Sequence, residues 1–481
     1  MKKTSFIASA IVSMMLLSGC NTGFKGSVSS SATPSTPNNP TSNPSNSSSV
    51  TSSTSSEFQY TSDLPTFTAD EIKITFWHTM GDNLQTALNE IITEFNKVYP
   101  NIKVEHTQIG GYPDVRDNVL KNIPVNSTPH LAYCYPDHVA LYRDARAVEV
   151  LDSYISDINY GFTKEQRENF VKGFYEEGRT FGDGKMYSLP FVKSTEVLYY
   201  DATYFAKNKL TVPTTWDELW QVCRDIKKIN SKSVPFGYDS EANWFITNAE
   251  QNGYTYTSTD TSRGPAGHFL FNTKGNRDFV SDLKAKYDEG LFTTETMYGA
   301  YTSGLFTAAG DGKSYIGIGS TGGAGYQWSK NFETGIAQLP QTPGGKNAVI
   351  SQGPSICMLS KDNQQEEIAA WLFLKYLTTD KASQSKFALA SGYIPVSLEA
   401  QNSEEYQAYL ANANGTTQEG VKALAAKVAV EQSDKYFTSP TFVGSSQARD
   451  EVGNIIVNVL KGTPVEDAFK SAVQACIEAV S

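Results

Sequence analysis

The segment from Gly26 to Ser56 limits which part of this chain can form a folded domain. It contains no charged residue and consists almost entirely of Ser, Thr, Asn and Pro. Such a composition buries too little apolar surface to offset the entropy that is lost on ordering. We therefore expect a disordered linker over residues 21–69, with a glycan-bearing stalk as the alternative. The remaining residues, 70–481, exceed one ordinary hydrophobic core and predict two domains.

The residues before this linker have the pattern of an export signal. Lys2 and Lys3 precede an uncharged, mostly apolar run from Thr4 to Ser18. A basic start, a short apolar core and small residues at the exit are typical of a secretory signal peptide, here over residues 1–20. The apolar run is shorter than the ~20 residues that span a bilayer.

The end of the signal suggests a lipid anchor. Residues 17–20 read Leu-Ser-Gly-Cys, which resembles the lipobox of bacterial lipoproteins. The resemblance implies that Cys20 is lipidated, becomes the new N-terminus and anchors the protein to the outer face of the cell membrane. An ordinary signal peptide that happens to contain a Cys is the alternative.

The net charge and the spacing of His and Cys residues restrict which ligands and partners the chain can bind. The formal net charge is −11 and the sequence has no basic stripe, which argues against nucleic acid as a partner. The histidines show no HExxH or comparable zinc-ligand spacing, so we expect no metal site and no cofactor. Cys134, Cys223, Cys357 and Cys476 form no CxxC pair, and whether any of them form disulfides in an exported chain stays open.

The beginning of the folded part alternates between strand and helix patterns. Residues 72–77 alternate between apolar and polar as a strand does, and residues 84–95 place apolar side chains at helical spacing. Strand patterns resume at residues 102–105 and 130–135. This order predicts an α/β fold with a mostly parallel sheet.

A helix start can be placed at Thr215. The side chains of Thr215 and Glu218 have the spacing of a capping box, in which each satisfies a free backbone N–H of the other residue. We therefore expect a helix to begin directly after Thr215.

Residues 317–322 match the Gly-x-Gly-x-x-Gly pattern of dinucleotide-binding loops. That site also needs a helix that opens there and an acidic residue about 20 positions further on. The acidic residue is missing, and Gly323 and Gly325 make a poor helix start. We interpret the motif as a strand end where the backbone approaches a ligand closely.

Three carboxylates leave an enzymatic interpretation open. Asp137, Glu196 and Asp239 stand near expected strand ends or loops. Paired carboxylates are the catalytic groups of most glycosidases. An exported glycan-active hydrolase is therefore an alternative function.

Ordered motifs along residues 70–481 carry a family resemblance. They are Phe76–Met80, Leu189–Tyr200, Tyr315–Gly325, Gly335–Pro340, Gln352–Ser355, Ala370–Leu374 and Ser391–Val396. Together they resemble the bacterial extracellular solute-binding proteins of family 1, which deliver sugars and related polyols to ABC importers. Within that family the chain is most similar to the glycerol-3-phosphate-binding branch.

The resemblance implies a two-lobed α/β fold of the periplasmic-binding-protein (Venus flytrap) type with crossing hinge strands. Residues 70–191 with 316–358 would form lobe 1, and residues 192–315 with 359–481 would form lobe 2. A mono- or oligosaccharide would bind in the cleft, and hinged closure would present it to the permease subunits. The implied protein is a monomeric receptor, not an enzyme.

The resemblance also implies a set of ligand contacts at matching positions. Aromatic faces suit the C–H side of a sugar ring, and carboxylate or amide groups suit its hydroxyls. A place in the core is the alternative for Trp77 and Tyr135. The implied contacts are Trp77, His78, Asn83, Tyr135, Asp137, Ser194, Trp244, Ser320, Gly322, Gly353, Tyr393 and Phe442.

One position departs from the glycerol-3-phosphate-binding branch. In that branch an Arg near the C-terminus holds the phosphate, and in this chain Phe442 stands at the matching position. A buried dianion without a guanidinium lacks its bidentate partner. The departure favours a neutral sugar over glycerol-3-phosphate or a glycerophosphodiester, although Lys193 or Arg449 could supply the charge instead.

Overall fold

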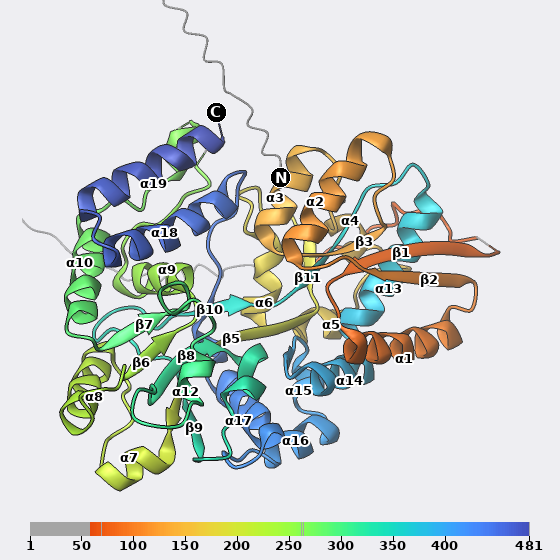
Figure 1. Cartoon of the computed structure of the whole chain (residues 1–481). Helices are drawn as coiled ribbons and strands as arrows, with labels where there is room; N and C mark the ends of the chain where they lie inside the picture. Colours follow the sequence, from red (N-terminus) through yellow and green to blue (C-terminus); the bar gives the residue numbers. More distant parts are fainter. Residues whose placement is uncertain (1–57, 69, 261, 263, 481) are drawn as a thin grey trace, which may run out of the picture. The chain divides into compact units, whose positions relative to one another are not determined.

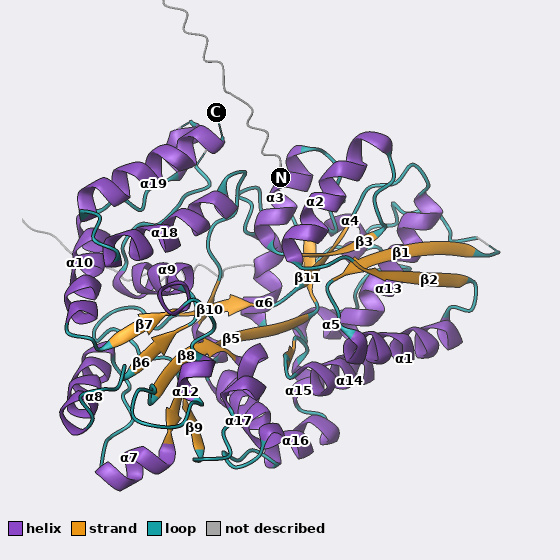
Figure 2. Ribbon diagram, viewed as in Figure 1, coloured by secondary structure: helices purple, strands orange, loops and turns teal. Residues whose placement is uncertain are grey.

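The computed structural model of the chain describes residues 58–68, 70–260, 262 and 264–480. The expected signal peptide, Cys20 and most of the expected linker lie outside the described residues. The described part contains two β-sheets, each flanked by helices (Figure 1, Figure 2).

The first sheet has five strands in the order β2-β1-β3-β11-β4. They are β1 (Ile72–His78), β2 (Ile102–Gln108), β3 (Leu131–Cys134), β4 (Ser188–Pro190) and β11 (Ser355–Met358). Strand β1 pairs in parallel with β2 and β3, whereas β11 runs antiparallel to β3 and β4. The expected mostly parallel sheet is therefore confirmed for its first three strands.

Two layers of helices cover this sheet. Side chains of α1, α13 and α14 share one hydrophobic core with β1, and side chains of α2 and α3 share another with β3. The helices on this side of the molecule are α1 (Asp82–Val98), α2 (Tyr112–Asn122), α3 (Pro136–Asp144), α4 (Asp152–Ser156), α5 (Lys164–Glu168), α6 (Lys172–Glu176), α13 (Gln364–Thr379) and α14 (Lys381–Ser391).

The second sheet has eight strands, six of them in the order β13-β10-β5-β8-β6-β7. Strands β9 and β12 also pair with β5. The strands are β5 (Val192–Asp201), β6 (Phe236–Tyr238), β7 (Phe292–Thr294), β8 (Ile316–Ser320), β9 (Thr334–Ala337), β10 (Val349–Gln352), β12 (Ile394–Pro395) and β13 (Tyr436–Phe437).

Helices α8, α9, α10, α18 and α19 contribute to the core of this second sheet, which is rich in aromatic rings. They are α8 (Trp216–Ile229), α9 (Glu241–Asn252), α10 (Lys274–Asp288), α18 (Ser445–Leu460) and α19 (Val465–Ala479). The remaining α-helices are α7 (Ala202–Asn208), α11 (Glu295–Tyr298), α12 (Ser303–Phe306), α15 (Leu398–Gln401), α16 (Glu404–Ala411) and α17 (Gln418–Glu431).

Local sequence signals set the helix starts and buried faces where we expected them. The backbone N–H of Glu218 donates to Thr215 Oγ1 at 3.2 Å, and the backbone N–H of Thr215 donates to Glu218 Oε2 at 3.1 Å. This confirms the capping box before α8. In α1, Leu88, Ile91 and Phe95 are buried, as their spacing predicts.

The strand pairing divides the chain differently from the implied lobe boundaries. Strands β8 and β9 pair with β5 in the second sheet, although the resemblance places residues 316–358 in lobe 1. Helices α13 and α14 pack into the core of the first sheet, although the resemblance places residues 359–481 in lobe 2. Sequence patterns predict the order of the strands along the chain but not their partners, and the partners decide which sheet a strand joins.

The end of the expected linker is folded. The backbone N–H of Thr61 donates to Ser156 O at 2.8 Å, and the backbone N–H of Phe67 donates to Tyr160 Oη at 2.6 Å. The guanidinium of Arg167 lies 3.4 Å from the ring centre of Phe58. The expectation of disorder up to residue 69 is therefore wrong for residues 58–68, whose aromatic side chains have partners near α4 and α5.

The chain passes between the sheets at two adjacent places. Strand β4 of the first sheet ends at Pro190 and β5 of the second begins at Val192, and Gln352 ends β10 three residues before β11. The two crossings are paired, because Gln352 is opposite Ser194. Gly353 has φ +95°, and a Cβ there would lie 2.7 Å from Val192 O. Only glycine fits both this left-handed backbone and this close approach.

A buried ion pair joins the crossings to the first sheet. The ammonium of Lys193 contacts Glu177 and donates to Gly353 O and Ser355 Oγ, each at 3.0 Å. Lys193 is 0 % and Glu177 3 % exposed. Ser355 Oγ also donates to Glu177 Oε1 at 3.0 Å. Both charges are therefore partnered. Through these contacts Lys193, on one crossing, is bonded to Gly353 on the other and to Glu177 beside the first sheet.

We predict that Lys193→Met lowers the free energy of unfolding by about 3–5 kcal/mol, because it leaves Glu177 buried without its counter-ion. Urea denaturation at pH 7 measures this. Lys193→Met with Glu177→Gln should recover most of the loss. Lys73→Met removes an ion pair of which both side chains are more than half exposed, and should cost under about 1 kcal/mol. Equal losses in Lys193→Met and Lys73→Met would contradict the role given to the buried pair.

Candidate functional site

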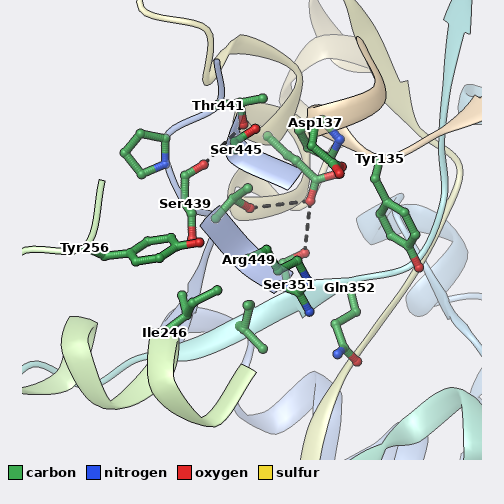
Figure 3. A pocket seen from close by; sticks show the side chains of 15 residues that line it. Tyr135, Asp137, Ile246, Tyr256, Ser351, Gln352, Ser439, Thr441, Ser445 and Arg449 are labelled. Atoms are coloured by element: carbon green, nitrogen blue, oxygen red, sulfur yellow. Dashed lines mark hydrogen bonds between the residues drawn. The ribbon is translucent and has the colours of Figure 1, made fainter. Parts of the chain in front are cut away.

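Two adjoining cavities lie where the ends of the second-sheet strands face the first sheet. We call the larger one, of about 660 Å³, the wide cavity, and the smaller one, of about 230 Å³, the narrow cavity. Gln352 and Arg449 line both. Figure 3 shows the narrow cavity, with Arg449 and Gln352 beside Ser351 and with Tyr135 and Asp137 of the first-sheet side across from them.

Glycines within and directly after β8 let polar side chains reach the wide cavity. A Cβ on Gly319 would lie 2.8 Å from Asp239 Oδ2, and a Cβ on Gly322 would lie 3.0 Å from the ring of Tyr393. The 3₁₀ segment η5 (Thr321–Gln327) follows the strand directly. The Gly-x-Gly-x-x-Gly segment therefore leads into no α-helix, which supports its interpretation as a strand end with close approach.

Glu196 belongs to a network that is already hydrogen-bonded. Its Oε2 accepts from Tyr238 Oη at 2.6 Å and its Oε1 accepts from Asn243 Nδ2 at 2.8 Å. Asn243 Oδ1 in turn accepts from the guanidinium of Arg449. Glu196 is 1 % exposed, and this burial raises its pKa to about 7. The network fixes Arg449 at the junction of the two cavities.

Two further carboxylates line the wide cavity. Asp239 Oδ1 accepts from both the backbone N–H and the hydroxyl of Thr302, each at 2.6 Å. Burial raises the pKa of Asp239. Burial, together with the charges of Asp239 and Glu241, raises the pKa of Glu295 to about 7. Acidic groups thus outnumber the guanidinium of Arg449 among the described residues that line this cavity.

Tyrosines form much of the aromatic surface of the site. Tyr393 lines the wide cavity, whereas Tyr135 lines the narrow one and lies 4.5 Å from Tyr112, centre to centre. Tyr301 and Tyr326 also line the wide cavity and are 66 % and 77 % exposed, so their rings are open to a ligand. Aromatic rings with a polar tip are suited to a ligand that has both C–H faces and hydroxyls.

The narrow cavity has a polar wall on the first-sheet side. Glu177 lines it and accepts from Ser351 Oγ and Thr438 Oγ1, each at 3.4 Å. The opposite wall includes Ile246 and Tyr256. The carboxylate of Glu177, which forms the buried ion pair with Lys193, therefore also reaches this cavity.

Some of the expected contacts meet at these cavities. Tyr135 and Asp137 line the narrow cavity, and Ser320, Gly322 and Tyr393 line the wide one. Two others stand directly behind. Ser194 is 2 % exposed and accepts from Ser320 Oγ at 3.2 Å, and Gly353 lies in the crossing.

Three expected contacts near the start of the chain lie elsewhere. Trp77 is partly buried in the core with α2 and α3. His78 is 0 % exposed and bonds His106 Nδ1 through Nε2 at 2.9 Å, and burial with the neighbouring His106 lowers its pKa to about 3. Asn83 is exposed on α1. None of the three lines either cavity.

Two expected contacts are core residues of the second sheet. Trp244 is 1 % exposed and stacks on Tyr238 at 4.7 Å, and Phe442 is 8 % exposed and stacks on His268 at 4.5 Å. Their rings are covered by neighbouring side chains, so they do not line either cavity. The guanidinium of the site belongs instead to Arg449, on the second turn of α18.

Sequence reasoning missed the polar residues that the fold gathers from separate loops. Asn243, Glu295, Tyr301, Gln327 and Gln352 all line the wide cavity. Arg449 was named from the sequence only as an alternative source of charge, and it is the only arginine after Arg277. Of the three carboxylates considered for a hydrolase, Glu196 and Asp239 share the wide cavity while Asp137 lines the narrow one.

The described part of the chain contains neither a candidate metal site nor a candidate membrane-spanning helix. Its His, Cys, Asp and Glu side chains form no group of three or more that could hold a metal ion. Within the same residues, no helix combines the length and apolar character that crossing a membrane requires.

Two sheets joined by paired crossings, with polar cavities beside the crossings, define a two-domain α/β binding protein that encloses a small solute. Residues 90–414 match the model of a family described as bacterial extracellular solute-binding protein. The chain belongs to this family.

Known proteins are similar to this chain in sequence or in fold. The sn-glycerol-3-phosphate-binding periplasmic protein UgpB of Brucella melitensis is 27 % identical over 347 residues, which cover 69 % of this chain and 76 % of that protein. An ABC substrate-binding protein of Listeria monocytogenes, solved with cycloalternan, has a TM-score of 0.68 at 19 % identity and covers 85 % and 99 % of the two chains. UgpB of Mycobacterium tuberculosis, solved with glycerophosphocholine, has a TM-score of 0.68 at 17 % identity, with 85 % and 98 % covered.

We predict that Glu295→Gln stabilises the protein above pH 7 and has no effect below about pH 4.5. The folded pKa of Glu295 is raised from 4.5 to about 7, so between these values the folded state holds a proton that the unfolded state has released. Its contribution to stability therefore falls as the pH rises through this window. Because Glu295 is partly exposed, solvent screening keeps the gain under about 1 kcal/mol.

Urea denaturation at pH 4, 6 and 8 measures this difference. Glu405→Gln, which removes an exposed carboxylate on α16, serves as the matched control and should change little at any pH. A Glu295→Gln variant that is less stable than the parent at pH 8 would contradict the prediction.

Proposed function

We propose that the protein is the solute-binding component of an ABC importer and that it captures a carbohydrate beside its hinge. The observation that carries the proposal is the composition of the wide cavity. Tyrosine rings stand there next to carboxylate, amide and guanidinium groups. A sugar presents an apolar C–H face and many hydroxyls, and this lining offers a partner for each.

The hinge supports delivery by closure. We propose that the first sheet with α1–α6, α13 and α14 forms one lobe, and that the second sheet with α8–α10, α18 and α19 forms the other. Bound solute would hold the lobes together by contacting both, which shifts the population toward a closed form. The permease subunits would then recognise that closed form. We propose a monomeric receptor, since a single chain supplies residues to both walls of the cavities.

A binding role without catalysis fits the hydrogen bonds of Glu196 and Asp239. Both oxygens of Glu196 are engaged by Tyr238 and Asn243, and Asp239 accepts two hydrogen bonds from Thr302. A general acid or nucleophile needs a free oxygen directed at the scissile bond. The relatives are named as binding proteins, and we propose that this chain likewise performs no turnover.

A phosphate-bearing solute is the second candidate, and Arg449 is the observation that favours it. Its guanidinium lines both cavities and is suited to a phosphate. UgpB of Brucella melitensis is named for glycerol-3-phosphate and UgpB of Mycobacterium tuberculosis was solved with glycerophosphocholine. Against it stand Glu196, Asp239 and Glu295, which would repel a dianion. We therefore place a carbohydrate first.

We propose that the protein is exported and held at the outer face of the cell membrane by a lipid on Cys20. The basic start, the apolar run and the Leu-Ser-Gly-Cys ending support this. Two or more acyl chains on one residue would hold the protein firmly, because one chain alone binds a membrane only marginally.

We predict that a matching carbohydrate raises the melting temperature and is recovered unchanged. A ligand at 100 times its Kd adds about 2.7 kcal/mol of stability. A thermal-shift screen over mono-, di- and oligosaccharides and glycerophosphodiesters measures this, with chromatography of the solute afterwards. Solution scattering with the best solute should show a smaller radius of gyration.

Two tyrosine variants test whether the carbohydrate binds in the wide cavity. Tyr393→Ala should weaken the best solute at least about tenfold, since it removes an aromatic wall. Tyr254→Ala, a partly exposed tyrosine outside both cavities, should bind as the parent does. Stabilisation by none of the sugars, or hydrolysis of any of them, would overturn the carbohydrate-receptor proposal.

We predict that Cys20→Ser abolishes lipid labelling and releases the protein from membranes. In cells fed radiolabelled palmitate, the parent should carry label and sediment with the membrane fraction, whereas the variant should carry none. Cys134→Ser, which changes a buried cysteine of the first sheet, should keep its label. A parent protein without label would show that the anchor is absent.

A further inference from the structure

Arg449 lies where the two cavities meet. Among the residues that the structure describes, only Arg449 and Gln352 line both cavities. The side chain of Arg449 comes from the second turn of α18 and is partly exposed. Figure 3 shows it beside Ser351, with Tyr135 and Asp137 on the other side of the narrow cavity. A solute that extends from one cavity into the other must therefore pass this cation.

Buried hydrogen bonds hold Arg449 from behind. The Nδ2 of Asn243 donates to Glu196 Oε1 at 2.8 Å, and the guanidinium of Arg449 donates to Asn243 Oδ1. Asn243 and Glu196 are both buried. Because both oxygens of Glu196 accept hydrogen bonds, the amide nitrogen of Asn243 turns toward Glu196 and its amide oxygen toward Arg449. Asn243 therefore sets the orientation of the guanidinium.

Most of the hydrogen-bonding capacity of Arg449 is unused. A guanidinium carries several N–H donors in one rigid plane. Within the described part of the chain, the only hydrogen bond of this side chain goes to Asn243, and it forms no ion pair. Donors that are fixed between two cavities are suited to an acceptor that lies between two parts of one solute.

The surrounding charges decide which acceptor fits. Burial raises the pKa of Glu196 to about 7, and the charge of Arg449 opposes this rise, so the two groups are close. Asp239 and Glu295 also line the wide cavity, and Asp137 lines the narrow one. These carboxylates disfavour a second anion beside Arg449. A hydroxyl or a glycosidic oxygen accepts a hydrogen bond without bringing a charge.

The two cavities are too large for a single sugar ring. They measure about 660 and 230 Å³, whereas sites that enclose a whole drug-sized ligand measure about 300–1,000 Å³. Each cavity also has tyrosine rings of its own. Tyr135 and Tyr256 line the narrow cavity, and Tyr301, Tyr326 and Tyr393 line the wide one. Each cavity is therefore equipped for a separate sugar unit.

Resting on the carbohydrate-receptor function proposed above, we infer that Arg449 selects uncharged solutes of two or more sugar units. One unit lies in the narrow cavity and the next lies in the wide cavity. The guanidinium donates to the oxygen that links them or to a hydroxyl beside that link. Asn243 is a positioning residue that acts through Arg449. A single sugar unit occupies one cavity and leaves the contacts of the other unmade.

The test compares sugars that differ only in the number of units. For each disaccharide that stabilises the protein in the thermal-shift screen, calorimetry gives its Kd and that of its constituent monosaccharide. The first pairs are maltose and cellobiose with glucose, xylobiose with xylose, and mannobiose with mannose. In the parent, at least one disaccharide should bind at least about tenfold more tightly than its monosaccharide, because it makes contacts in both cavities.

Removal of the guanidinium assigns this preference to one residue. Arg449→Gln should weaken the disaccharide at least about tenfold and the monosaccharide less than about threefold, since only the disaccharide reaches the junction. Arg277→Gln serves as the matched control. It removes an arginine of α10 that lies outside both cavities, and it should keep the preference of the parent.

A second variant tests the positioning role of Asn243. Asn243→Leu removes the hydrogen bond that orients Arg449 and should reduce the preference for the disaccharide to less than about threefold. Arg449→Gln combined with Asn243→Leu should lose no more preference than Arg449→Gln alone, because the two residues act as a unit. A merely structural role would lower the melting temperature of the free protein and leave the preference unchanged. If Asn243→Leu does not fold, Asn243→Ser replaces it.

The outcomes separate this inference from the function on which it rests. Monosaccharides that bind as tightly as their disaccharides would overturn the inference and leave the carbohydrate-receptor function intact. A preference that survives in Arg449→Gln would overturn the role of Arg449, and one that survives in a folded Asn243 variant would overturn its positioning role. A glycerophosphodiester that binds more tightly than every disaccharide, and only with Arg449 present, would assign the guanidinium to a phosphate and overturn the inference. A screen in which no sugar binds would overturn both.

Discussion

The structure depends on an ion pair placed where the chain passes from one sheet to the other. Lys193 and Glu177 are almost fully buried, and Gly353 and Ser355 complete their hydrogen bonds. Charges removed from water stabilise a fold only when all of them are partnered. The pair thereby fixes both crossings at one point, and the polar cavities open beside that point. Both crossings are therefore held by the same set of buried contacts.

The chemistry of the site comes from the ends of strands and from the loops that follow them. Gln352 ends β10, Ser320 ends β8, and Asp239 follows β6 directly. These ends face the other half of the protein, so side chains that are far apart in sequence meet there. Gly319 within β8 and Gly322 after it leave the room that Asp239 and Tyr393 need. The result is a cavity whose lining is acidic and aromatic and whose guanidinium is held to one side.

Local patterns in the sequence predicted local structure well. The helical spacing of α1, the capping box at Thr215 and the strand end at residues 317–322 follow from neighbouring residues and are found in the structure. Features that depend on residues far apart in the sequence were not predicted correctly. The pairing of β8 with β5 places residues 316–320 in the second sheet, and the burial of Trp244 in the core of that sheet keeps its ring out of both cavities. Neither strand pairing nor burial depth is encoded in the spacing of single motifs.

Residues 58–68, the first that the structure describes, are attached to one half of the protein. They bond to the loops around α4 and α5 and to Gln365 on α13, and all of these belong to the half that is built on the first sheet. Residues 58–68 are therefore attached to that half by every one of these contacts. The half built on the second sheet makes none of these contacts with residues 58–68, so closure around a solute would move that half without breaking any of them.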